Sequence, residues 1–284
     1  MSDFWFLSFA NTSLGGRIRN PSVRIRKQAE AMGVFGNRIR VWNENDLDGE
    51  FRDKMKDHLI PGSRGYGYWC WKPQIVLQLL REMKDGDVLL YADAGCHLNP
   101  KGVSRLWEYF NLALEHGIVA FQSRSLDEAR RNDLSQHFFT DGEWSKGDLL
   151  DHFGVRDDEK ITRTGQLGGT VFLVRKDNCA ICFFEKFRDV FEAHFELCDD
   201  SPSQSSNLSD FRENRHDQSV FSILGKMQGI FSRSSLEYDP MNGGDDWSCM
   251  LNYPIWAKHD KGGVRSLFPN WFKRVVHNVS GGLI

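Results

Sequence analysis

Short apolar runs alternate along the chain with segments whose apolar residues recur at helical spacing. Nearly uninterrupted apolar runs, typical of strands covered on both faces, lie at 4–9, 88–92, 118–121 and 171–174, and a further strand is expected at 38–42. Periodic segments that predict helices lie at 21–33, 50–59, 73–83, 102–115, 177–195 and 219–227. The alternation of strands and helices predicts an α/β fold around a parallel sheet. No internal repeat or domain boundary is visible, so one domain over 1–284 is expected.

The strand predicted at 88–92 ends abruptly in an acid, because Asp93 follows it and Gly95 comes two residues later. Ligands of open α/β sheets bind beyond the carboxyl ends of the strands. A carboxylate there is a natural ligand for a divalent cation and, through the cation, for a diphosphate. Gly95 would let a ligand or another backbone approach closely. The alternative is an ordinary strand followed by a turn.

The segment 64–73 is the most unusual part of the chain, because glycines alternate with aromatic residues between Arg64 and Lys72. The glycines disfavour a helix. Aromatic rings pack against the C–H faces of sugars or against bases, and the two cations could hold phosphates. A loop that only packs aromatic side chains remains the alternative.

Three further candidates stand at element boundaries. Asp217 lies at or near the N-terminus of the helix predicted at 219–227, where it is either a helix cap or a general base for an acceptor hydroxyl. Gly168 and Gly169 precede the strand at 171–174 and suggest close backbone approach. His259 lies between two lysines, where it could meet a metal or a diphosphate or simply be a surface histidine.

The composition adds limits rather than a function. A formal net charge of −3 makes a general nucleic-acid binder an unlikely class, while 13% aromatic residues suit a large core, a sugar-binding cleft or a membrane-facing rim. Cys179 and Cys182 form the one C-x-x-C spacing, and we expect buried structural thiols in a reducing compartment. Without a signal peptide or membrane span, the expected location is cytoplasmic. The tail at 267–276 leaves open a peripheral contact with the inner membrane.

The combined motifs resemble a bacterial family of GT-A-type glycosyltransferases from capsule and lipopolysaccharide biosynthesis. The resemblance rests on RGYGYWCWKP at 64–73, DGD at 85–87, YADAGC at 91–96, WSKGD at 144–148, QLGG at 166–169 and HDQS at 216–219. It covers most of the chain, from the first strand to His259. It implies a Rossmann-like GT-A fold with a mixed, mainly parallel sheet, and residues from about 240 onward would complete the donor site or form a docking tail.

The resemblance also implies an activity, namely transfer of a hexose from a nucleotide-sugar, usually a UDP-sugar, to a hydroxyl of a surface glycan or lipid-linked acceptor. The donor-binding residues that it implies are Arg64, Tyr68, Trp71, Lys72, Asp93, Gly95, Gln166, Gly168 and Gly169. Asp217 matches the position of a catalytic carboxylate, and the Asp-Gln sequence leaves inversion and retention both open.

The metal site departs from the family pattern. Asp93 matches the first acid of the Asp-x-Asp motif that holds Mn²⁺ or Mg²⁺, but Gly95 stands where the second acid is expected. Either His259 completes the ion site, or Arg64 and Lys72 neutralise the diphosphate. Two other functions remain as alternatives: a sugar nucleotidyltransferase, for which Gly15-Gly16-Arg17 is a poor phosphate loop, and a non-catalytic carbohydrate-binding protein.

Overall fold

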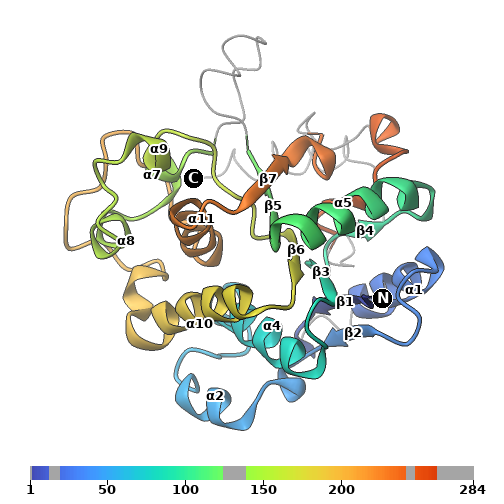
Figure 1. Ribbon diagram of the computed structural model, residues 1–284. Coiled ribbons are helices and arrows are strands. Elements are labelled where there is room, and N and C mark those ends of the chain that lie inside the picture. The colour runs from blue at the N-terminus through green and yellow to red at the C-terminus, as the bar shows by residue number, and fades with distance from the viewer. Residues whose placement is uncertain (1, 13–19, 124–138, 241–246, 261–284) are drawn as a thin grey trace, which may run out of the picture.

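A six-stranded sheet forms the centre of the molecule in a computed structural model that describes residues 2–12, 20–123, 139–240 and 247–260 (Figure 1). Its strand order is β2-β1-β3-β6-β5-β7. The strands are β1 (Phe4–Phe9), β2 (Ile39–Trp42), β3 (Val88–Ala92), β5 (Ile118–Gln122), β6 (Val171–Arg175) and β7 (Phe231–Ser234). β6 runs antiparallel to both of its neighbours, and the other three pairings are parallel. The predicted α/β fold with a mixed, mainly parallel sheet is confirmed.

Helices cover both faces of this sheet, and each face has its own apolar core. Successive side chains of β3 alternate between the two cores: Leu89 and Tyr91 belong to one, and Val88 and Leu90 to the other. Helices α4 (Trp71–Glu82), α10 (Asn178–Ala193) and α11 (Asp217–Met227) pack on the Tyr91 face, while α1 (Pro21–Met32) and α5 (Val103–His116) pack on the opposite face (Figure 1). Both faces are therefore buried, as the unbroken apolar runs predict.

The remaining elements are short and connect these layers. They are α2 (Gly49–Lys54), α3 (Gly65–Tyr68), α7 (Asp141–Trp144), α8 (Gly147–His152), α9 (Glu159–Thr162), β4 (His97–Leu98) and β8 (Ile255–Trp256), with 3₁₀ turns at 44–46, 100–102, 195–197, 235–237 and 248–250. β4 and β8 pair as a separate antiparallel ribbon. This ribbon brings the segment 247–260 back beside the end of β3.

Local sequence signals explain both ends of α1 and the start of α10. Asn20 accepts hydrogen bonds at the start of α1, Pro21 occupies its first position, and Gly33 ends it with φ of 72°. Asp177 caps α10 by accepting from the amide of Ala180. The aromatic stripe on α10 is core, as predicted, since Phe183, Phe184, Phe187 and Phe191 are at most 1% exposed.

Three sequence predictions need correction. α4 begins at Trp71 rather than at Pro73. The N–H groups of a helix's first turn have no partner within the helix, so a proline, which lacks an N–H, is tolerated there. Cys179 and Cys182 are exposed rather than buried, because both lie on the side of α10 that faces solvent. The short α2 also ends five residues before the predicted helix at 50–59 does.

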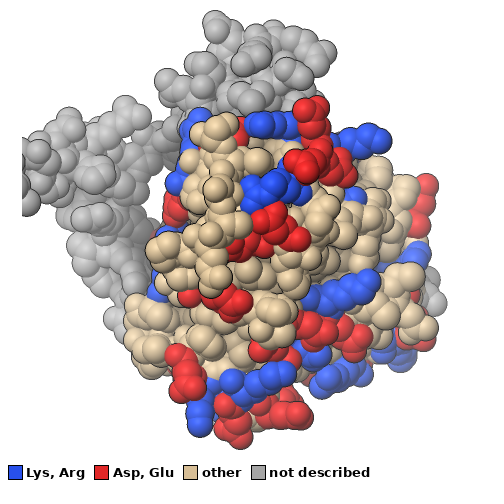
Figure 2. All heavy atoms as spheres, turned by 90° about the vertical axis from the view of Figure 1, so that its left-hand side faces the viewer, with Lys and Arg blue, Asp and Glu red and all other residues tan. Residues whose placement is uncertain are grey.

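Some predictions lie outside the described residues, namely the Gly15-Gly16-Arg17 loop and the tail at 267–276. Across the described helices, none is both long and apolar enough for a bilayer span. Figure 2 shows one face of the molecule, on which basic and acidic side chains are interspersed.

Candidate active site

A cavity of about 280 Å³ opens at the edge of the sheet where β3 and β5 end. Asp93 follows β3 and Ser123 follows β5, so both reach this edge from carboxyl ends of strands. Because β6 is antiparallel to them, its amino end comes to the same edge, and Gly168 and Gly169 join the lining there. The first residues of α11 complete the wall with Asp217.

A buried ion pair stands in this wall. The Lys72 Nζ donates to Asp217 Oδ2 at 2.5 Å and to the carbonyl of Gly169 at 2.9 Å, and it lies 3.4 Å from Asp93 Oδ1. The side chains of Lys72 and Asp217 are 3% and 8% exposed, whereas that of Asp93 is 30% exposed. Tyr91 lies beneath the lysine, with its ring centroid 5.3 Å from Nζ, and donates its hydroxyl to Asp93 Oδ1 at 2.6 Å. Two carboxylates thus share one buried ammonium.

Burial and pairing act against each other on these charges. Burial raises the pKa of Asp217 to about 6, although the ammonium of Lys72 opposes the rise. Burial also lowers the pKa of Lys72, but the attraction of Asp217 and Asp93 outweighs it and leaves that pKa above its ordinary value. Lys72 is therefore protonated at neutral pH, while the pKa of Asp217 is raised toward neutrality.

Strained backbone surrounds the cavity. Five non-glycine residues of the described chain have positive φ, and three of them line it: Trp69 at 61°, His216 at 54° and His259 at 50°. The other two, Tyr66 and Tyr68, belong to α3, just before Lys72. Each such residue costs of the order of 1–3 kcal/mol, and such strain clusters at functional sites.

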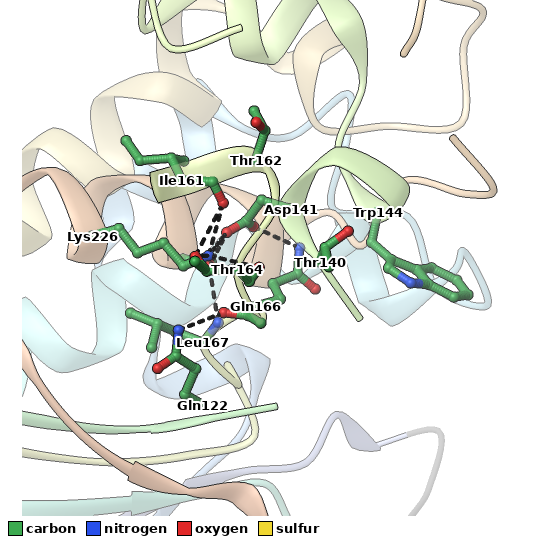
Figure 3. A network of polar contacts seen from close by, with 12 residues as sticks. Gln122, Thr140, Asp141, Trp144, Ile161, Thr162, Thr164, Gln166, Leu167 and Lys226 are labelled. Carbon is green, nitrogen blue, oxygen red and sulfur yellow. Dashed lines mark hydrogen bonds and ion pairs between the residues drawn. The ribbon is translucent and has the colours of Figure 1, made fainter. Parts of the chain in front are cut away.

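A polar network behind the cavity, shown around Asp141 and Gln166 in Figure 3, fixes the side-chain amides of Gln166 and Gln218. The buried carboxylate of Asp141 can only accept, so Gln166 presents its Nε2 to it, at 3.0 Å. Gln166 Oε1 then faces Gln218 and accepts from its Nε2 at 2.6 Å. Gln218 Oε1 in turn accepts from the amide of Gly169 at 3.3 Å. The side chain of Gln218 is thereby held beside Asp217 in the cavity wall.

The counter-ion of Asp141 is Lys226, at the far end of α11, with its Nζ 2.6 Å from Oδ2. Ser222 also donates to Oδ2, at 2.7 Å. The ammonium of Lys226 donates to the carbonyls of Ile161 and Thr164 and to the Thr164 hydroxyl, at 2.8–3.1 Å (Figure 3). All of these groups are satisfied within the protein.

The C-terminal segment supplies the rim next to Asp93. Asp260 donates its amide to the carbonyl of Gly95 at 2.9 Å, and a Cβ on Gly95 would lie 3.3 Å from the Cα of His259. The close approach that the sequence suggested for Gly95 is thus made by backbone rather than by a ligand. Arg24 clamps the segment through Asp260 at 3.0 Å and the carbonyl of Ala94 at 2.6 Å.

Most of the predicted site residues meet at this cavity. Its lining includes Arg64, Lys72, Asp93, Gln166, Gly168, Gly169, Asp217 and His259. Three others lie elsewhere: Gly95 supports the rim, Tyr68 packs between Phe195 and His216, and Trp71 is core. Trp71 stacks on Phe9 and donates its indole N–H to the carbonyl of Gly65, which removes its ring from any ligand.

Sequence reasoning missed several lining residues, among them Arg215, Gln218 and Tyr238. Gln218 belongs to the HDQS motif and Arg215 directly precedes it, so their closeness to Asp217 in the sequence could have pointed to them. Tyr238 had none, because it meets Gly168 only in the fold: a Cβ on Gly168 would be 2.3 Å from its hydroxyl oxygen.

No protein-family model and no curated protein matches the chain. Solved structures do resemble it. A glycosyltransferase involved in glycosylation of the major capsid of PBCV-1 superposes with a TM-score of 0.48 and 8% identity, over 89% of this chain and 91% of that one. Mouse xyloside xylosyltransferase 1, in its apo form, superposes with a TM-score of 0.45 and 9% identity, over 90% of this chain and 97% of that one. The galactosyltransferase LgtC, in complex with donor and acceptor sugar analogs, superposes with a TM-score of 0.42 and 13% identity, over 84% of this chain and 74% of that one. These values describe a similarity of fold alone.

Proposed function

We propose that the chain is a GT-A-type glycosyltransferase that moves a sugar, of the hexose type, from a UDP-sugar to a hydroxyl of a surface glycan or its lipid-linked precursor. The observation that carries this proposal is the buried pair of Lys72 and Asp217, which faces a cavity together with Asp93 at the carboxyl ends of the strands. Buried charges cost free energy, so a pair that lines a cavity suggests use by a ligand.

The donor diphosphate would lie near Asp93. Lys72 and Arg64 line the same cavity and would stabilise the negative charge that develops as the diphosphate leaves. Lys72 is fixed before the reaction by its bond to the carbonyl of Gly169, so it needs little reorganisation. Arg64 is held at the mouth by Asp200, at 3.2 Å, and by Glu213, at 2.5 Å.

Asp217 would act as the base if the reaction inverts the anomeric centre. The acceptor oxygen would bond to the anomeric carbon, the bond from that carbon to the diphosphate oxygen would break with its electron pair, and the hydroxyl proton would pass to Asp217. A pKa of about 6 suits this transfer, because most of the carboxylate is ionised at neutral pH and still accepts a proton readily. Retention remains the alternative, since Gln218 lies in the same wall.

A divalent cation would be held by Asp93 and His259, with phosphate oxygens and water completing its shell, as is usual for Mg²⁺ sites. Within residues 2–12, 20–123, 139–240 and 247–260, no three His, Cys, Asp or Glu side chains form a metal-binding group. Asp93 Oδ1 is engaged by Tyr91 and Lys72, and no hydrogen bond of the described residues uses Oδ2. These residues therefore fit a cation that arrives with the nucleotide. Its contribution would be neutralisation of the diphosphate.

The proposal is tested by thermal unfolding with a panel of nucleotide-sugars, each with and without Mn²⁺. A donor at about 100 times its Kd should raise Tm by about 5 °C. Asp93→Asn should abolish this shift, and the control Asp85→Asn, at a carboxyl that is 89% exposed, should keep it. Absence of a shift with every nucleotide-sugar would contradict the proposal. A shift that does not depend on Mn²⁺ would reject the cation and leave Lys72 and Arg64 as the groups that neutralise the diphosphate.

A further inference from the structure

Arg215 lines the cavity, and no carboxylate in the part of the chain that the structure describes is bonded to its guanidinium. Its backbone amide donates to the carbonyl of Trp144 and to Ser219 Oγ, both at 3.1 Å, which fixes the residue just before α11. Its guanidinium makes no hydrogen bond or ion pair with any residue in the described part of the chain. By contrast, Arg64 and Lys72, the other two such cations in the lining, are each held by carboxylates.

Two aromatic rings hold this guanidinium in place. Its Cζ lies 4.1 Å from the ring centroid of Trp144 and 5.4 Å from that of Phe139, and the two rings are 4.9 Å apart. When a guanidinium stacks on aromatic rings, its flat face contacts the rings, and its N–H groups, which lie in the plane of the guanidinium, can still donate hydrogen bonds. Such a fork matches the paired oxygens of a carboxylate or a phosphate.

One acid, Glu213, attracts the charge of Arg215 but is not bonded to it. Glu213, two residues away, is bonded to Arg64, which also holds Asp200. Burial lowers the pKa of Arg215, yet an arginine stays protonated under any physiological condition. A half-buried cation whose hydrogen bonds are unmade costs free energy, and an anionic ligand would recover it.

Arg215 is linked to the β5 side of the cavity, although the charge of Arg64, which we assign to the diphosphate, also repels it. Phe139, one of its two rings, accepts a hydrogen bond at its carbonyl from Ser123, which follows β5. Asp93 and His259, in contrast, meet at the end of β3, and β6 lies between these two strands. A diphosphate beside Asp93 would leave the β5 side of the cavity to the acceptor.

We infer that Arg215, framed by Trp144 and Phe139, forms a subsite for an anionic group on the acceptor, either the carboxylate of a uronic acid or a sugar phosphate. This inference rests on the proposed function, because it assigns the ligand as an acceptor. It adds a substrate class: the enzyme extends an acidic glycan in preference to a neutral one.

The test measures binding without any donor, by calorimetry or ligand-observed NMR with millimolar sugars. The probes are methyl β-glucuronide, glucose 6-phosphate and neutral methyl β-glucoside, with UDP as a separate ligand. The wild-type protein should bind at least one anionic probe about tenfold more tightly than the neutral one. Arg215→Met should remove that preference and Arg215→Lys should keep part of it. The control Arg163→Met, at an exposed arginine outside the cavity lining, should change nothing. A preference for only one anionic probe identifies the anion.

Equal binding of neutral and anionic probes by the wild-type protein would overturn the inference, and this comparison needs no variant to fold. A loss of UDP affinity in Arg215→Met as large as the loss for the anionic sugar would also overturn it, by assigning Arg215 to the donor. If the protein binds nucleotides but shows no preference for anionic sugars, the result contradicts the proposed subsite and not the proposed function. If the protein binds anionic sugars at Arg215 but binds no nucleotide, the result contradicts the proposed function and not the anion-binding subsite.

Discussion

Two buried pairs of lysine and aspartate share one helix, and they differ in what surrounds them. α11 begins with Asp217, which pairs with Lys72, and it carries in its last turn Lys226, which pairs with Asp141. Each charge has the sign that its end of the helix dipole favours. Asp141 is 0% exposed and bonded on both oxygens, and Lys226 has three further oxygen acceptors. Asp217 instead borders a cavity and has a raised pKa.

The two pairs have the same composition but different surroundings, and we expect one to serve ligand chemistry and the other to serve stability. A pair whose hydrogen bonds are all made inside the protein has nothing left to offer a ligand, and its removal is felt in folding. A pair that shares one ammonium between two carboxylates, with one of them 30% exposed, can rearrange when a ligand arrives. We therefore expect activity to depend on the Lys72 pair and stability to depend on the Lys226 pair.

The largest effect is expected for Asp217→Asn. If Asp217 is the base, the rate of sugar transfer should fall by about 10²–10⁴-fold, measured as product formed per enzyme under saturating donor. Lys72 keeps Asp93 and the carbonyl of Gly169, so Tm should fall less than in Asp141→Asn. Transfer within threefold of wild type would remove Asp217 from the mechanism.

Asp141→Asn should chiefly destabilise the fold. The change leaves the ammonium of Lys226 without its counter-ion in a buried site, which costs about 3–5 kcal/mol. Urea unfolding followed by fluorescence measures this loss. Lys226→Met in the same protein tests the pairing, because the double variant should be less destabilised than the sum of the two single changes. Additive losses would mean that the two charges are not coupled.

The pH dependence of kcat/KM should respond to changes in the Lys72 pair but not to changes in the Lys226 pair. If Asp217 acts as a base, kcat/KM should fall as pH drops below about 6. Lys72→Gln removes the ammonium that lowers this pKa, so the acid limb should move up by about 1–3 pH units. The control Lys226→Met should leave the limb in place, although it reduces stability.

Stability should have the opposite dependence at Asp217. Its folded-state pKa of about 6 is above the ordinary 3.8, so the folded protein binds this proton more tightly than the unfolded chain does. The contribution of Asp217 to the free energy of unfolding is therefore greatest at acidic pH and is lost as pH rises through about 6. In Asp217→Asn this component of the pH dependence should disappear.

The smallest effect is expected for Thr164→Val. Lys226 loses one hydroxyl acceptor at 2.8 Å but keeps two carbonyls and Asp141, so the free energy of unfolding should fall by about 0.5–1.5 kcal/mol. Activity should remain within twofold of wild type. A large loss of activity with this small loss of stability would show that the network behind the cavity also serves catalysis through Gln166 and Gln218.

The strands, the main helices and much of the cavity lining were predictable because their signals are local. The apolar runs set the sheet, and the acid after β3 and the acid that begins α11 both reach the cavity edge, as expected. Trp71 was misplaced because sequence does not tell which ring of an aromatic cluster faces the core. The pair of Asp141 and Lys226 left no signal, because its members are 85 residues apart (226 minus 141) and meet only after the sheet has formed.

The clamp on the C-terminal segment has a consequence for synthesis of the protein. Arg24 bonds to the carbonyl of Asp260 across 236 residues of sequence, and Asp260 also meets His97 across 163. A nascent chain can pair all six strands of the sheet once β7 has left the ribosome, yet the rim beside Asp93 is still missing. The rim beside Asp93 is thus completed only after residues 247–260 have emerged, and a product cut off after β7 would keep the strands of the sheet but lack this rim.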